Sequence, residues 1–250
     1  MHASDILKLN NRGVELLRLG KLSNAEQLFR QCLLGSLTEF IPCNQTFHHP
    51  FCSAAGTQTA FIPLEQQVGH EENYFGSNTI PHTQGLCLDE SVLKIYDDTV
   101  ATQSIISAIF IYNLGVVDLC FTFKQLTSSG APKLTPSRRE QLLCRALCLF
   151  EKAIFILERT GIAGVTNVAI ADFFMVALYN NVGCILVEVG QFAAAKVAFG
   201  KVTRMAIALQ RFLLAEEEKN HEIMDCMKGH LESFTLNALL HQEPSSAAAA

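Results

Sequence analysis

The chain has 250 residues, of which 49% are hydrophobic and only 17% are charged, and its formal net charge is −5. This charge argues against a nucleic-acid-binding surface, which needs clustered Lys and Arg, and the high hydrophobicity excludes wholesale disorder. The length fits one large domain or two small ones.

The N-terminal region and the cysteines indicate the cellular compartment. Residues 1–20 are amphipathic, with charges spread through them, and do not form an apolar signal sequence. The nine cysteines are an odd number scattered along the chain. We therefore expect an intracellular, cytoplasmic protein without a disulfide framework.

Two amphipathic helices are predicted first, over residues 4–19 and 23–34. Residues 35–98 then break every helical pattern, with four of the seven prolines and four of the eight histidines. They hold eight acidic side chains and one lysine, a charge of −7, whereas the rest of the chain carries +2. We expect an irregular acidic insertion, attracted weakly to the remainder, with a short β-hairpin formed by residues 86–88 and 92–96.

Two further helix pairs and a final helix follow the insertion. The first pair is predicted at 99–125 and 135–159, around a loop at 126–134, and the second at 168–189 and 192–214. The final helix, 216–241, is expected to cap the array, before a disordered tail at 242–250. The uncharged stretch 99–117 contains several polar residues, so a helix buried in protein is favoured over a membrane span.

Three segments share one skeleton of glycine, alanine and phenylalanine. Gly13, Gly20, Ala25 and Phe29 have the same spacing as Gly183, Gly190, Ala195 and Phe199. A second copy starts at Gly115 and resumes at Ala146 and Phe150, with 31 residues from Gly to Ala in place of 12. The first Gly allows close approach of the second helix, and Gly20 and Gly190 permit a turn with positive φ.

This skeleton resembles the tetratricopeptide repeat (TPR), a helix–turn–helix unit of about 34 residues. The resemblance implies an all-α solenoid of three repeats, at 4–34, 99–159 and 168–214, followed by the capping helix. Proteins with this repeat generally bind other proteins on the concave surface lined by their first helices, which gives a set of candidate groove residues: Asn10, Val14, Arg18, Tyr112, Asn113, Val116, Asn180, Asn181, Cys184 and Glu188.

Asparagines recur two residues before the first Gly of each copy, as Asn11, Asn113 and Asn181. Their amides suit two roles, which both stay open: holding an extended backbone, or hydrogen bonding within the stack. Some TPR proteins clamp the acidic C-termini of chaperones with Lys and Asn, but Asn10 and Val14 stand at those positions here. We therefore expect an apolar peptide or helix as the partner, not a carboxylate.

Motifs for chemistry are weak. Cys43, His48, His49 and Cys52 cluster, but their spacing matches no usual zinc site. No phosphate-binding loop, metalloprotease helix or nucleophile elbow occurs. We expect no enzyme activity, no cofactor and no metal.

Three hypotheses for the function follow. The leading one is a non-catalytic interaction scaffold or adaptor, with no nucleic acid or membrane partner. The alternative is a self-occluded module in which residues 35–98 cover the groove until a partner displaces them. The third is an enzyme or metal site within the insertion.

Overall fold

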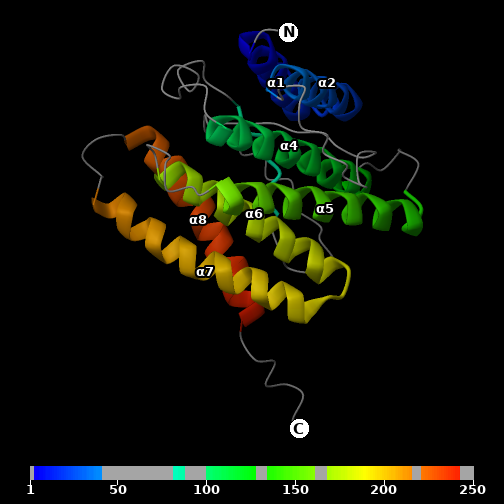
Figure 1. Cartoon of the computed structure of the whole chain (residues 1–250). Helices are drawn as coiled ribbons and strands as arrows, with labels where there is room; N and C mark the ends of the chain where they lie inside the picture. The colour runs from blue at the N-terminus through cyan, green and yellow to red at the C-terminus, as the bar shows by residue number, and fades with distance from the viewer. Residues whose placement is uncertain are drawn as a thin grey trace. The chain divides into compact units, whose positions relative to one another are not determined.

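The computed structural model describes residues 3–40, 81–87, 100–127, 134–160, 168–215 and 221–242. Every regular element in these ranges is an α-helix, as Figure 1 shows, which confirms the all-α class. The helices are α1 (Ala3–Arg18), α2 (Leu22–Phe40), α4 (Val100–Thr127), α5 (Pro136–Thr160), α6 (Val168–Glu188), α7 (Phe192–Ala215) and α8 (His221–Gln242).

The chain divides into two units. Unit 1 comprises residues 1–62 and 83–164, and unit 2 comprises 63–82 and 165–250. In unit 1, α1 packs on α2, α4 packs on α5, and α2 lies beside α4. In unit 2, α6 packs on α7, and α8 packs against both. The described helices therefore form three hairpins, two in unit 1 and one in unit 2, and α8 adds to the hairpin of unit 2.

The same close contact holds each hairpin together. A Cβ added to Gly13 would lie 2.5 Å from the ring of Phe29, one on Gly115 would lie 2.5 Å from Phe150, and one on Gly183 would lie 2.7 Å from Phe199. All three rings are fully buried. A phenylalanine of the second helix thus fills the space that a side chain on the first helix would need, and this is the physical basis of the Gly-to-Phe spacing in the sequence.

Two of the three hairpins turn through a glycine with positive φ, namely Gly20 at 67° and Gly190 at 76°. Gly20 N–H donates to Leu17 O at 2.9 Å, and Lys21 N–H donates to Leu16 O at 2.8 Å. Gly190 and Gln191 repeat this pair of bonds with Val187 and Leu186. These are Schellman caps, which satisfy the last carbonyls of the first helix, so the predicted turns are confirmed.

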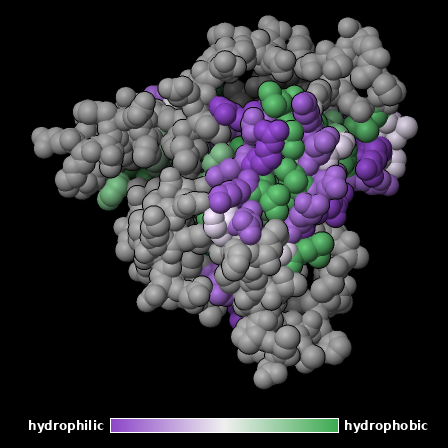
Figure 2. All heavy atoms as spheres, turned by 90° about the horizontal axis from the view of Figure 1, so that it is seen from above, coloured by the Kyte–Doolittle hydropathy of each residue, from purple (hydrophilic) through white to green (hydrophobic). Residues whose placement is uncertain are grey.

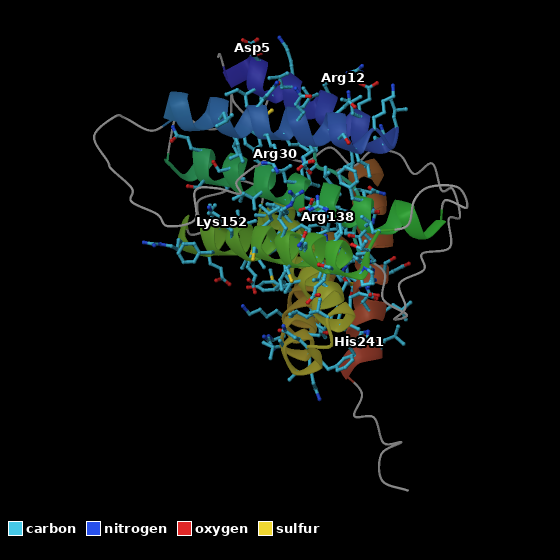
Figure 3. The ribbon with its side chains drawn as sticks, turned by 90° about the vertical axis from the view of Figure 1, so that its right-hand side faces the viewer. Asp5, Arg12, Arg30, Arg138, Lys152 and His241 are labelled. Carbon is cyan, nitrogen blue, oxygen red and sulfur yellow. The ribbon has the colours of Figure 1, made fainter. Side chains whose placement is uncertain are left out.

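The buried apolar residues of α1 lie on one side of the helix. Ile6, Leu7, Val14 and Leu17 are buried, and they recur at the spacing of one helical side. Asp5 and Arg12 are exposed and point outward from α1 in Figure 3. Seen from above, where the α1–α2 hairpin faces the viewer, Figure 2 shows mainly hydrophilic residues with a strip of hydrophobic ones between them.

Two helices are long and apolar enough to cross a membrane, over Gln103–Thr122 in α4 and Ala171–Glu188 in α6. Of these windows, 78% and 83% are buried inside the protein. Core helices that pack against neighbouring helices have hydropathy of this kind as well.

An ion pair network joins the two hairpins of unit 1. Arg145 of α5 donates through Nε to Asp118 Oδ2 of α4 at 2.6 Å, and through Nη2 to Asp118 Oδ1 and to Glu26 Oε1 of α2, the latter at 3.0 Å. Arg30 also pairs with Glu26, and it lies between α2 and α4 in Figure 3. Burial raises the pKa of Asp118, and Arg145 opposes this only in part. Asp118 stands three residues after Gly115, where the other hairpins have Leu16 and Leu186.

Some boundaries differ from the prediction. Helix α2 continues to Phe40, six residues beyond the predicted end at 34, because Gly35 lies inside the helix and the next breaker is Pro42. The β-hairpin is not borne out: residues 86 and 87 form no strand, and Leu86 bonds to the side chain of Asn113 on α4. The second predicted strand, 92–96, lies outside the described residues. Residues 1–2, 41–80, 88–99, 128–133, 161–167, 216–220 and 243–250 lie outside the described residues, and they include the zinc candidates Cys43, His48, His49 and Cys52. The predicted tail, 242–250, also lies outside them except for Gln242, which ends α8.

We predict that Gly183→Ala destabilises the protein by about 1–3 kcal/mol, because the added methyl group overlaps the Phe199 ring. Gly200→Ala is the matched control: it lies in α7 of the same unit, and its nearest neighbour to an added Cβ is Arg204 Nη1 at 3.8 Å. That substitution should be neutral or stabilise by about 0.4–1 kcal/mol. Urea unfolding followed by circular dichroism measures both, and equal effects at the two glycines would contradict the packing described.

We predict that Arg145→Leu costs about 2–4 kcal/mol, because it leaves Asp118 buried without its guanidinium partner. The double variant Asp118→Leu/Arg145→Leu should recover most of the loss, since Leu occupies the equivalent position of the other hairpins. Arg12→Leu, which removes an exposed pair with Glu15, is the control and should change stability by less than about 0.5 kcal/mol.

The loss in Arg145→Leu should also depend on pH. A carboxyl whose pKa is raised on folding destabilises the fold when it is ionised, and protonation relieves that cost. The single variant should therefore lie closer to wild type at pH 5 than at pH 8. Thermal unfolding at the two pH values measures this difference. A double variant as unstable as the single variant would contradict the assigned role of the Asp118–Arg145 pair.

Candidate functional site

Residues 81–87, which we call the extended segment, are mostly buried although they belong to no helix. Pro81, His82, Gly85, Leu86 and Cys87 are buried, and Gln84 is exposed. Pro81 and His82 belong to unit 2, and residues 83–87 belong to unit 1. Since a buried peptide group without a hydrogen bond is costly, the partners of this backbone define the site.

In unit 1, the side-chain amide of Asn113 on α4 binds both peptide groups of Leu86. Asn113 Oδ1 accepts from Leu86 N–H at 2.7 Å, and Asn113 Nδ2 donates to Leu86 O at 2.9 Å. Asn10 of α1 donates to the same carbonyl at 3.2 Å, and its Oδ1 accepts from Asn113 Nδ2 at 3.2 Å. All three residues are buried, so the amides replace the hydrogen bonds that a neighbouring strand would supply.

We use the word clasp for the pair of hydrogen bonds that one asparagine amide makes with the N–H and the C=O of a single residue. Further residues of unit 1 contact the rest of the segment. Tyr112 of α4 donates its hydroxyl to Gln84 O at 3.3 Å, and Cys120 Sγ lies 3.9 Å from Thr83 O. A Cβ on Gly85 would lie 3.0 Å from Leu17 Cδ2 and 3.2 Å from Val14 Cγ2, so the backbone there lies directly on α1.

The thiol of Cys87 follows Leu86 and is also buried. Burial raises the pKa of Cys87 to about 11, although the positive charge of Arg18 acts in the opposite direction. The thiol is therefore neutral at physiological pH and behaves as a small apolar group.

In unit 2, Asn181 of α6 makes the same clasp on His82. Asn181 Oδ1 accepts from His82 N–H at 2.6 Å, and Asn181 Nδ2 donates to His82 O at 2.9 Å. The imidazole lies edge-on to Phe173, His230 and Phe234, with ring centroids 6.4, 4.8 and 5.5 Å away. Burial, with a smaller contribution from His230, lowers the pKa of His82 well below its usual value, so the ring is neutral at physiological pH.

Helix α8 contacts two further residues of α6. Asn237 of α8 donates to Asn180 Oδ1 at 2.7 Å and lies 3.8 Å from Cys184 Sγ. These two predicted groove residues therefore contact α8. Val116 is fully buried in α4, and Glu188 is half-buried at the end of α6.

The structure thus brings only part of the predicted set to the extended segment: Asn10, Val14, Tyr112 and Asn113 in unit 1, and Asn181 in unit 2. Arg18 lies near enough to Cys87 for its positive charge to act on the pKa of the thiol. Of the two roles left open for the recurring asparagines, Asn113 and Asn181 hold an extended backbone, while Asn11 Oδ1 accepts from Asn10.

Sequence reasoning offered residues 35–98 as one possible occupant of the groove, but it did not single out His82 and Leu86 as the residues bound by the asparagines. It also missed the aromatic surroundings of His82. Asn237 was also missed, although an amide among the apolar positions of a capping helix is a usable signal. Within the described ranges, no group of three or more His, Cys, Asp or Glu residues is arranged to hold a metal ion.

The chain matches no protein-family model, no curated protein and no solved structure.

We predict that unit 2 loses stability in mild acid because of His82. A histidine whose pKa is lowered by folding does not reduce the free energy of unfolding at pH values above its pKa in the unfolded state. Below that pH the unfolded state binds the proton more readily, so the free energy of unfolding falls. The loss from His82 should begin near its unfolded pKa of about 6.5 and grow as the pH falls toward 5.

Urea unfolding between pH 7.5 and 5 measures this slope. His82→Phe keeps an aromatic ring in the same surroundings and should flatten the slope. The pKa of His230 is also lowered by burial, so His82→Phe/His230→Phe should flatten it further. An unchanged slope in the double variant would contradict the assignment.

Proposed function

We propose that this chain is a non-catalytic protein-interaction module built from TPR-like hairpins, which binds an extended apolar peptide on the first helices of its hairpins. In unit 1 this face consists of Asn10, Val14, Leu17, Tyr112 and Asn113. The extended segment of the chain itself occupies the face until a partner peptide replaces it. The proposal combines the interaction scaffold with the self-occluded alternative.

The observation that carries the proposal is the two-way hydrogen bonding of Leu86 by Asn113. An amide that accepts from the N–H and donates to the C=O of one residue recognises extended backbone, because a helix uses both groups internally. This favours an extended peptide over a helix as the partner. The repeat of the clasp by Asn181 on His82 supports a common role for the first helices.

The composition of the face supports an uncharged ligand. Asn10, Val14, Tyr112 and Asn113 are all fully buried and carry no charge. Among the residues that the structure describes, this face offers no cation to a chaperone tail, a nucleic acid or another polyanion, apart from Arg18 near Cys87. No two described cysteines form a disulfide, which agrees with the proposed location in the reducing cytoplasm.

The test uses the full chain and a labelled peptide of residues 79–90. Leu86→Asp places a charge on a buried side chain of the segment, and it should release the segment from the face. The peptide should then bind this variant in trans, as measured by fluorescence anisotropy. Wild type should bind it far more weakly, because its own segment competes at an effective concentration on the order of mM.

Gln84→Asp is the matched control, since it adds the same charge at an exposed residue of the segment and should behave as wild type. Adding Asn113→Leu to the Leu86→Asp variant should abolish capture. If Leu86→Asp does not fold, as judged by circular dichroism, Gly85→Val opens the face by a clash with Val14 and Leu17. Failure of both folded variants to bind the peptide, or equal binding by wild type, would refute the proposal.

A further inference from the structure

The contacts of the extended segment with unit 1 define which peptides the face accepts. We infer that it selects a glycine followed by a large apolar residue, in extended conformation, and that Val14 and Leu17 enforce the glycine. The inference rests on the proposed function and adds the sequence of the ligand to it.

The register of the peptide is fixed at one residue. Leu86 receives two bonds from Asn113 and one from Asn10, and Tyr112 bonds the carbonyl two residues earlier. A shift by one residue would point each peptide group the other way, away from these amides. The side chains on either side of the clasp therefore occupy defined places on the face.

The place before the clasp is tight for any side chain. At Gly85 an added Cβ would meet Leu17 Cδ2 at 3.0 Å and the two Val14 methyl groups at 3.2 and 3.3 Å. Val14 is fully buried and β-branched, so it has little freedom to move aside. Alanine requires these neighbours to give way slightly, and a branched residue adds further methyl groups to the overlap.

The place at the clasp requires an apolar side chain. Leu86 is only 5% exposed, so a charged or polar side chain at this place would lose its contact with water. The place two residues earlier, Gln84, is exposed and contributes only its carbonyl oxygen. Backbone recognition thus supplies affinity for any extended chain, while Gly85 and Leu86 supply the selectivity.

The experiment measures labelled variants of the 79–90 peptide against the opened full chain, Leu86→Asp, by anisotropy under reducing conditions. We expect peptide Gly85→Ala to bind about fivefold more weakly and peptide Gly85→Val about fiftyfold more weakly, as overpacking predicts. Peptide Leu86→Ala should lose about thirtyfold through lost burial. Peptide Gln84→Ala should stay within about twofold.

A complementary change on the protein tests the cause. Adding Val14→Ala to the opened chain should reduce the difference between the unmodified peptide and its Gly85→Ala variant to about twofold, because the obstructing methyl groups are gone. Thermal unfolding checks that this variant is folded. If no peptide binds the opened chain, the proposed function itself fails. If all the peptides bind alike, or Val14→Ala leaves the preference unchanged, the face binds peptides and the inferred selectivity is wrong.

Discussion

A peptide group buried away from water needs a hydrogen-bond partner, and this requirement governs the interior of the protein. Helices satisfy their own backbone, so an extended segment buried among helices has no strand to pair with. Asparagine solves the problem because its amide offers one acceptor and two donors, as Asn113 does for Leu86. The dependence is mutual, since Asn10 and Asn113 are themselves fully buried and need that backbone as much as it needs them.

The hairpin packing places the clasps. Asn113 and Asn181 each stand two residues before the glycine that contacts a phenylalanine, Gly115 and Gly183. Two residues correspond to about 200° around a helix, so the amide lies on the side opposite the phenylalanine. One turn of the first helix therefore serves two neighbours: the glycine admits the second helix on one side, and the asparagine holds the extended segment on the other.

The sequence predicted what depends on local spacing and missed what depends on distant pairing. The Gly-to-Phe spacing, and the turns at Gly20 and Gly190, follow from residues close together in the chain. For Leu86 and Cys87 the sequence suggested extended backbone correctly but assigned a strand as partner, because apolar runs carry no sign of which group will bond them. The pairing of Asp118 with Arg145 spans 27 residues, and only the lone acid in an apolar helix hinted at it.

The clasp also constrains how a partner enters. Removing the extended segment from unit 1 without replacement would break three hydrogen bonds of Leu86, two with Asn113 and one with Asn10, each with a net contribution of about 0.5–1.5 kcal/mol. Entry is therefore an exchange of one backbone for another, not the opening of an empty face. The attached segment competes at an effective concentration on the order of mM, so a partner present at micromolar levels needs an advantage of about 4 kcal/mol. The clasp cannot supply this advantage, because it binds every extended backbone equally. The advantage has to come from side chains at the places of Gly85 and Leu86, or from contacts that a partner makes beyond the segment.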